Sequence, residues 1–482
     1  MQRLFALLAA LALTLPLAAQ GRAGRGAAAD FVTVHAPVVA LEHVTVIDGT
    51  GAAARANQTV VINQGRIAAL GADGAVSVPA GAQVMDLAGD SVFPGLVGMH
   101  DHLFYPAPSG AGRVPGQPAL YNEMGFSFPR LYLAGGVTTL RTTGSVMPYT
   151  DLELKKRIDN GSMPGPHLYI TGPYLEGAGA YTPNMHELTG PEDATRLVNY
   201  WAAEGATSFK AYMHITRAEL AAAIQAAHAH GLKITGHLCS IGFKEASDLG
   251  IDDLEHGIEV DTEFDAAKQP DTCPAGNQTS TTLTNLDLAS PAFRDMIQDL
   301  VRHHTAVTST LPVFEISVPG RPPLQPRVLA ALSPEAKADY LLGRDRIATG
   351  NGAQRAIFEK EKQFEHAFAV AGGTLLAGLD PTGYGGVLAG YGDQREVELL
   401  VEAGFTPLQA LHIATQNGAD FLGIGDRTGT VAVGKSADLV VVRGNPSQRI
   451  ADIENVRLVF KDGQGYDPQK LAASVAGAVG LH

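Results

Sequence analysis

Two histidines separated by a single residue, His100 and His102, follow the apolar run 91–99. Side chains alternate between the two faces of a β-strand, so both imidazoles would leave the end of one strand in the same direction. Two imidazoles on one face can be ligands of one metal ion. The same spacing also occurs on surfaces and within hydrogen-bonded cores. The metal interpretation therefore depends on further ligands elsewhere in the chain.

Four later strand-like runs also end near side chains that can bind metal or transfer protons: Lys210, His237, His256 and Asp380. Each has an ordinary explanation on its own, as a solvated lysine, a structural histidine or an aspartate that begins a turn. Taken with the first pair, they give four histidines, a lysine and an aspartate at the ends of predicted strands. This combination is typical of a two-metal hydrolase and not of a packed core.

The elements that must position these residues follow from the middle of the chain, about 91–425, where apolar strand-like runs alternate with helical stretches. One helix is predicted from Thr216 to His230, with Glu219 completing a capping box, and another begins after Thr406. Strands are predicted near Val92, Thr138, Leu168, Ser208, Lys233, Asp253, Val307 and Leu375. The pattern predicts an α/β fold, a (β/α)8 TIM-like barrel whose active site lies at the C-terminal ends of the strands.

Both ends of the chain have a different texture. Residues 30–90 and 426–482 contain short alternating segments separated by turn signals, which predict β-strands. We expect the two ends to build one small β-sandwich domain beside the barrel at 91–425.

The first residues, 1–29, are predicted to be a secretory signal peptide and leader. Arg3 gives a positive start, 4–19 is an apolar stretch, and small residues follow. A membrane anchor is the alternative, but the stretch is short for a spanning helix. We therefore expect a secreted or periplasmic protein with no membrane attachment after cleavage.

Composition limits the partners. The chain has 482 residues, 45% of them hydrophobic, so it can bury a large core, and its formal net charge of −14 disfavours a nucleic-acid partner. It contains two cysteines, Cys239 and Cys273. After export they would be able to form one disulfide, and two free thiols are an equally open alternative.

The chain resembles metal-dependent amidohydrolases of the imidazolonepropionase-like and prolidase-like branch, over nearly everything after the leader. One departure is Leu379, where many members have threonine before the aspartate. The resemblance is carried by Pro94-Gly95-Leu96 before the histidine pair, by Glu255-His256-Gly257, by 408–415 (LQALHIAT) and by 434–440 (GKSADLV).

The resemblance implies a binuclear metal centre. His100 and His102 would bind the more buried ion together with Asp380, and His237 and His256 would bind the second. Lys210 would be carboxylated by CO2 and would bridge the two ions, its carbamate offsetting their charge. Zinc suits this ligand set, with manganese or cobalt as alternatives.

The same residues predict the reaction. Two divalent ions can activate a water and polarise a carbonyl group, while Asp380 would act as general base and then as general acid. Lys210 favours a hydrolase over a mononuclear deaminase, which needs no bridging lysine. A non-catalytic binding protein of this type should have lost ligands, and none of the six is missing.

The resemblance also indicates a small-molecule amide or dipeptide as substrate and a homo-oligomeric protein. We expect a carboxypeptidase-like amidohydrolase of N-acyl amino acids, including ochratoxin-type amides that release phenylalanine. An Xaa-Pro dipeptidase is the first alternative, and a lactonase or cyclic-amide hydrolase is the second. Tyr212, His186 and Arg141 are predicted to contact a substrate carboxylate.

Overall fold

The computed structural model describes residues 27–107, 119–350 and 352–481. The predicted signal peptide and leader therefore lie outside the described residues, apart from 27–29. Among the helices that the structure describes, none combines the length and the apolar character that crossing a membrane requires.

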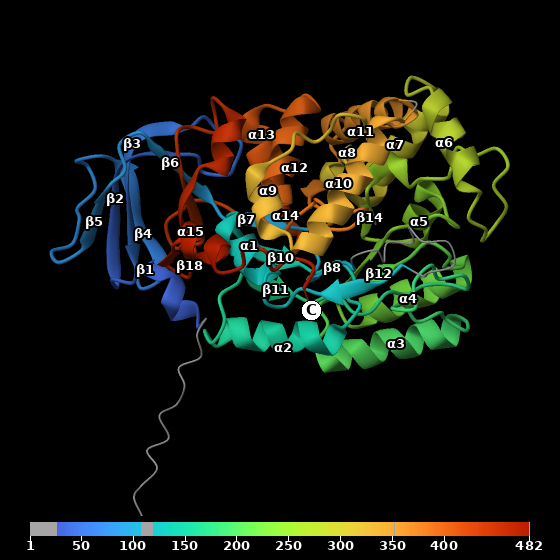
Figure 1. Cartoon of the computed structure of the whole chain (residues 1–482), viewed down its shortest axis with the longest axis horizontal. Helices are drawn as coiled ribbons and strands as arrows, with labels where there is room; N and C mark the ends of the chain where they lie inside the picture. The colour runs from blue at the N-terminus through green and yellow to red at the C-terminus, as the bar shows by residue number, and fades with distance from the viewer. Residues whose placement is uncertain (1–26, 108–118, 351, 482) are drawn as a thin grey trace, which may run out of the picture.

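Strands from the two chain ends pair with each other in a nine-stranded sheet of order β1-β19-β18-β17-β6-β2-β3-β4, with β5 against β2. In Figure 1, β2, β3, β4 and β5 of this terminal sheet lie at one end of the molecule. Strands from both chain ends thus meet in one hydrogen-bonded sheet, and its pairing does not by itself show the predicted β-sandwich. The strands are β1 (Val32–Val34), β2 (Val38–Val46), β3 (Arg55–Asn63), β4 (Arg66–Ala72), β5 (Gln83–Asp86), β6 (Asp90–Pro94), β17 (Leu439–Arg443), β18 (Val456–Lys461) and β19 (Gln464–Tyr466).

Strand β17 is buried on both faces, which explains why its sequence is continuously apolar. Leu439 and Val441 pack in the hydrophobic cluster of the terminal sheet. Val440 and Val442, which point the other way, pack in the large cluster of the α/β part. One strand thus contributes to two cores, as side-chain alternation requires.

Eight parallel strands form the middle of the chain, in two sheets of order β11-β10-β7 and β12-β13-β14-β15-β16. Figure 1 shows helices lying around this region. The strands are β7 (Leu96–Gly98), β10 (Val137–Arg141), β11 (His167–Tyr169), β12 (Ser208–Ala211), β13 (Lys233–Gly236), β14 (Asp253–Glu255), β15 (Ala306–Ser309) and β16 (Leu375–Ala377).

The two parallel sheets adjoin at both of their edges. A parallel bridge between Thr171 and Ser208 connects the end of β11 to β12. On the other side, the Met99 amide donates to the Ala377 carbonyl at 2.8 Å, which connects β7 to β16. The arrangement is TIM-barrel-like, with the C-terminal ends of the strands on one rim.

The first predicted strand is in fact two. Val92 belongs to β6 of the terminal sheet, and the parallel strand β7 begins only at Leu96. Gly95 lies between them, where an added Cβ would stand 2.0 Å from Thr138 Oγ1. The close approach needs glycine, and it divides one apolar run between two sheets.

Helices cover the parallel strands. The predicted capping box at the start of α4 is present, because the Thr216 side chain accepts from the Glu219 amide and the Glu219 side chain accepts from the Thr216 amide. The helix after Thr406 continues beyond α13 as a π-helix over Ile413–Asn417. The helices of eight or more residues are α2 (Pro148–Asp159), α3 (Pro191–Glu204), α4 (Arg217–Ala229), α6 (Gly276–Asn285), α7 (Pro291–His303), α10 (Pro334–Ala348), α11 (Ala353–Val370) and α12 (Tyr391–Glu402).

Shorter elements complete the chain. The strands β8 (Phe104–Pro106) and β9 (Tyr121–Glu123) form an antiparallel pair beside the rim. The short helices are α1 (Phe128–Ala134), α5 (Phe243–Leu249), α8 (Leu311–Glu315), α9 (Pro326–Ala331), α13 (Pro407–His412), α14 (Gly418–Phe421) and α15 (Pro468–Ala473).

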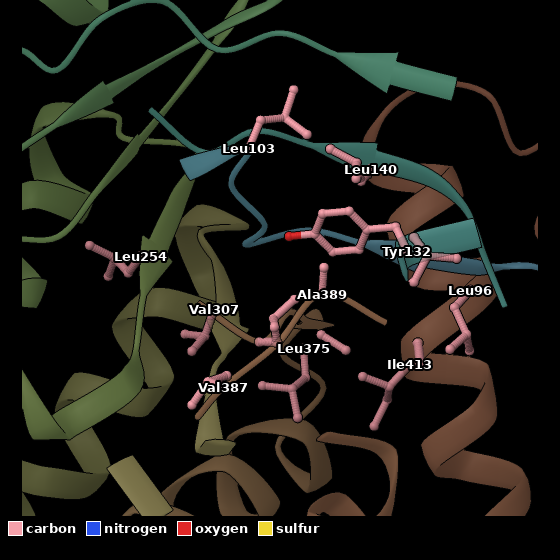
Figure 2. Packing of buried hydrophobic residues seen from close by; sticks show 14 of the residues in the cluster. Leu96, Leu103, Tyr132, Leu140, Leu254, Val307, Leu375, Val387, Ala389 and Ile413 are labelled. Carbon is pink, nitrogen blue, oxygen red and sulfur yellow. The ribbon is translucent and has the colours of Figure 1, made fainter. Parts of the chain in front are cut away.

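Alternation along the parallel strands separates a helix-facing layer from the barrel interior. Leu254 of β14 packs in the large hydrophobic cluster, with Val307 and Leu375 of the neighbouring strands (Figure 2). Its neighbours Asp253 and Glu255 lie on the other face and bind Arg141. The strands thus direct polar side chains inward, toward the rim that carries the predicted site.

Several buried carboxyl groups make stability depend on pH. Glu365 of α11 is fully buried, and burial raises its pKa to about 8. An unfolded glutamate has a pKa of about 4.3. The stabilising contribution of the neutral carboxyl is therefore fully present below about pH 4 and is lost as the pH rises through 8.

We expect the melting temperature of the native protein to fall between pH 6 and pH 9, and Glu365→Gln to lose less over the same range. The amide cannot ionise, so the difference should reach a few kcal/mol in unfolding free energy, of the order set by the pKa change. Thermal unfolding at several pH values measures this. Glu359→Gln, on the exposed side of the same helix, is the control. Equal pH dependence of the native protein and Glu365→Gln would contradict the assignment.

Candidate metal centre

The structure brings all six predicted side chains to the C-terminal rim of the parallel strands. His100 and His102 follow β7, Lys210 lies in β12, and the others follow β13, β14 and β16. Five of the six are buried, and His237 is partly exposed toward a larger chamber.

Their donor atoms face one another. His100 Nε2 lies 3.2 Å from Lys210 Nζ and 3.8 Å from Asp380 Oδ2. The other oxygen of Asp380 lies 3.5 Å from His102 Nε2, and His256 Nε2 lies 3.9 Å from Asp380 Oδ2. The rings of His237 and His256 are 4.4 Å apart. At these distances, the nitrogen and oxygen atoms of the six side chains are close enough together to bind metal ions placed between them.

Each of three imidazoles uses Nδ1 for a hydrogen bond and leaves Nε2 toward the centre. His100 Nδ1 is 2.6 Å from Glu255 Oε2, and His102 Nδ1 is 2.9 Å from the Thr142 carbonyl oxygen. Both partners can only accept, so Nδ1 carries the proton and Nε2 keeps its lone pair. His256 Nδ1 is held by Thr310 Oγ1 at 2.7 Å.

The donor set fits a metal site. Among the described residues, His256 Nε2 and Asp380 Oδ1 are buried without a hydrogen-bond partner, which is costly unless a ligand or ion occupies the space between them. Burial lowers the pKa of His237 to about 3 and lowers the pKa values of the other three imidazoles well below the usual range. Neutral imidazole is the form that binds metal.

Two of these residues have unusual backbone geometry. His256 has φ +72° and Asp380 has φ +49°, in the left-handed region that favours glycine. Such strain is concentrated at functional sites, where it directs a side chain that a regular strand would send elsewhere. Close packing adds a constraint, because a Cβ on Gly378 would stand 2.4 Å from the His100 backbone nitrogen.

Two other groups of described residues have metal-ligating side chains near one another, His167 with Asp438 and Asp462, and Asp248 with Asp299 and His303. Each already includes a cation. Lys461 Nζ lies 3.5 Å from Asp462 Oδ2 in the first group, and Lys244 Nζ lies 3.4 Å from Asp248 Oδ2 in the second. These cations reduce the negative charge that would attract a metal ion.

A cavity lined by the six residues shares part of its wall with a chamber of about 620 Å³. The two share Tyr121, Tyr181 and Tyr212 as part of their common wall. Aromatic and aliphatic side chains supply much of the remaining chamber, among them Phe314, Leu283 and Ile357. The chamber can hold a bulky, partly apolar group beside the metal ligands.

The chamber rim contains a disulfide, the pairing that the sequence left open. Cys239, two residues after His237, is bonded to Cys273 in the segment before α6. Both cysteines line the chamber. The bond therefore ties the segment that follows His237 to the segment before α6.

The three predicted substrate contacts have different outcomes. Tyr212 lines both cavities, and its hydroxyl donates to the Tyr181 hydroxyl at 3.4 Å. His186 lines neither and instead contacts Asp193 at 3.1 Å, because its segment turns toward the start of α3. The prediction for His186 is therefore not supported by its position.

The position of Arg141 does not support the predicted substrate contact. Its guanidinium is 1% exposed and lies below the metal ligands, where it binds Asp253 and Glu255. Arg141 lines neither the cavity at the six residues nor the chamber. Position at the end of a strand suggested the rim, but the side chain points into the barrel interior.

Tyr121 is a wall residue that sequence reasoning missed. Its hydroxyl is 3.1 Å from that of Tyr181, and it stands in β9. The pairing of β9 with β8, which follows the histidine pair, brings it to the site. No local pattern around Tyr121 signals this placement.

Comparison with protein-family models identifies one family. The model described as Amidohydrolase family matches residues 91–307 and 384–465, leaving Asp380 in the unmatched stretch between them. The search of curated proteins gave no match.

Solved structures resemble the whole described fold. A candidate prolidase from Bifidobacterium longum is 26% identical over 91% of this chain and 98% of that chain, with a TM-score of 0.63. A Xaa-Pro dipeptidase with bound methionine is 21% identical over 89% and 100% of the two chains, with a TM-score of 0.65. The ochratoxinase of A. niger is 19% identical over 90% and 96%, with a TM-score of 0.63. The last two likenesses establish a shared fold.

Proposed function

This chain belongs to the amidohydrolase family and is a metal-dependent hydrolase of amide bonds, and from that premise we propose that it works through a binuclear centre with a carboxylated lysine. His100, His102 and Asp380 would hold one ion, and His237 and His256 the other. Lys210 would bridge them. When bound, two divalent ions, zinc for this ligand set, would polarise the scissile carbonyl and activate a water.

Lys210 is suited to carboxylation. It is buried, and burial lowers its pKa to about 8, so a substantial fraction of the amine is neutral near pH 7 to 8. The neutral amine attacks CO2, forming an N–C bond and releasing one proton, to leave an anionic carbamate. The positive charge that would repel cations is thereby replaced by two oxygen donors.

Asp380 is suited to proton transfer. Burial raises the pKa of its carboxyl to about 6, which is near neutrality, and its Oδ1 has no hydrogen-bond partner among the described residues. It would take the proton of the attacking water and return it to the departing amine. A pKa close to the working pH allows one group to do both.

The convergence of six ligating side chains around unpaired His256 Nε2 and Asp380 Oδ1 is the observation that carries this proposal. The wide aromatic chamber supports a large acyl or amine group over a small dipeptide. We therefore propose carboxypeptidase-like cleavage of N-acyl amino acids with an aromatic group, including ochratoxin-type amides. With Arg141 and His186 outside the chamber, hydroxyls such as that of Tyr212 would contact the substrate carboxylate.

Export is proposed separately, on the first 29 residues of the sequence alone. These residues support a secreted or periplasmic location.

Chelator treatment should reduce amide hydrolysis to background, and added Zn²⁺ should restore it, because the proposed ions supply both the activation of water and the polarisation of the carbonyl. Elemental analysis should find nearly two ions per chain.

The holoenzyme should cleave an N-acyl-phenylalanine at least about tenfold faster in kcat/KM than an Xaa-Pro dipeptide, a modest selectivity of the kind an apolar pocket provides. Mass spectrometry of the products measures the cleavage rates of the two substrates. Preference for the dipeptide would favour prolidase activity instead.

A further inference from the structure

Arg141 is one of the largest fully buried side chains of the described chain, and it lies beneath the predicted metal ligands. Removing a guanidinium from water is costly, and the cost is offset only by well-placed partners. An apolar side chain would fill the barrel interior without that cost. A charged group at this depth therefore calls for an explanation beyond packing.

Its contacts link β10 to β14 and to the segment that follows β7. From β10, Arg141 Nε donates to the Met99 carbonyl at 2.8 Å, immediately before His100. Its Nη2 donates to Asp253 Oδ2 at 2.8 Å and to Glu255 Oε1 at 2.9 Å, both on β14. The guanidinium thus holds the Met99 carbonyl, which immediately precedes His100 in the chain. It also holds the Glu255 carboxylate, which contacts the His100 ring.

That carboxylate continues the chain of contacts to the ligand itself. Glu255 receives Arg141 on Oε1 and His100 Nδ1 on Oε2, the latter at 2.6 Å. Thr235 Oγ1 also donates to Glu255 Oε1 at 2.5 Å. Both oxygens are therefore held, and rotation of the carboxylate would break contacts on both sides.

His100 differs in this respect from the neighbouring ligands. His102 Nδ1 is held by a backbone carbonyl and His256 Nδ1 by a hydroxyl, both uncharged. Of these three imidazoles, His100 has the carboxylate partner, and Arg141 supports that carboxylate. A carboxylate on Nδ1 orients the ring and makes Nε2 a stronger donor to metal.

We propose that Arg141 is a positioning residue of the metal centre. It locks Glu255 and the Met99 carbonyl so that His100 presents Nε2 toward Lys210 and Asp380. The inference rests on the proposed metal-dependent function, and it adds a residue that touches neither substrate nor metal.

The test measures metal affinity in the full-length protein, by Zn²⁺ competition with a chelator and by the visible absorption of bound Co²⁺. Arg141→Lys keeps the positive charge but cannot span Met99, Asp253 and Glu255 together. We expect it to weaken binding of one ion about tenfold, within the range found for partners of ligating histidines, and to alter the Co²⁺ spectrum. Glu255→Gln keeps the shape and should cause a similar loss.

The double variant Arg141→Lys/Glu255→Gln gives the sharpest result. If the two residues act through one contact, its loss of affinity should be close to that of either single variant and not to their product. A merely structural role would lower thermal stability without this coupling and without a spectral change.

Arg395→Lys is the matched control. Arg395 is a partly buried arginine with several carboxylate partners, Glu315, Glu398 and Glu402. We expect it to lower the melting temperature with unchanged metal affinity. Native affinity and spectrum in folded Arg141→Lys, or equal weakening in Arg395→Lys, would overturn the inference. If the native protein itself bound no ion, the proposed function would fail first.

Discussion

Asp380→Asn will lower kcat for amide hydrolysis by about 10³-fold, within the range that loss of a general acid–base group produces. Asparagine keeps the size of the side chain and one oxygen, but it cannot accept the proton of the attacking water. Asp380 Oδ2 lies near both His100 and His256, so the remaining oxygen can still serve as a ligand. Metal content, measured by elemental analysis on the same sample, should therefore remain largely intact.

The pH dependence gives a second readout. In the native enzyme, rate should fall on the acid side of the profile as Asp380 becomes protonated, and this limb should disappear in the variant. Asp452→Asn, at a buried aspartate beside β17, controls for loss of a buried carboxylate elsewhere. Retention of kcat within a factor of three at full metal content would remove Asp380 from proton transfer.

Lys210→Ala should remove the bridging ligand and reduce both metal and activity. We expect content to fall from nearly two ions to about one, and kcat/KM to fall by about 10³-fold, since the substrate would lose the paired electrostatic stabilisation of its transition state. The physical reason is charge: without the carbamate, two cations would have less anionic compensation in a buried space. Elemental analysis and steady-state kinetics measure the two losses.

Rescue distinguishes a missing ligand from a damaged fold. Acetate or propionate can enter the space left by the lysine side chain and should restore part of the metal content and rate. In the native protein, ¹³C-labelled CO2 should give a carbamate carbon signal that is absent from the variant. Lys233→Ala, on the next strand with its ammonium 3.9 Å from the Phe421 ring centroid, is the control. Two bound ions and native rates in Lys210→Ala would exclude a bridging carbamate.

The sequence could predict the parallel-strand core and the six-residue site because both depend on local patterns. A strand places alternate residues on opposite faces wherever it lies, so His100 and His102 must emerge together. A capping box needs only the four residues from Thr216 to Glu219, and it defines the start of α4. The C-terminal ends of the strands share one rim of a barrel-like arrangement, which brings residues as distant as His100 and Asp380 together.

Depth and long-range pairing were decided by the tertiary structure. Arg141 occupies a strand end like the ligands do, but whether such a side chain turns to the rim or into the interior depends on Asp253 and Glu255, more than a hundred residues away. Val92 and Leu96 belong to one apolar run, and only the pairing of β6 with β17 assigns them to different sheets. A hydrophobic pattern in the sequence predicts that a residue is buried. It does not identify the hydrophobic core in which the residue packs.

By itself, the sequence determined which chemistry this protein carries, since residue types and strand periodicity are local properties. The tertiary structure decided which residues surround that chemistry. It placed Arg141 against Asp253 and Glu255, left His186 outside the chamber, and brought Tyr121 and the Cys239–Cys273 bond to its wall. These placements depend on contacts between segments far apart in the chain, whose distances are fixed only when the strands pair and the core packs.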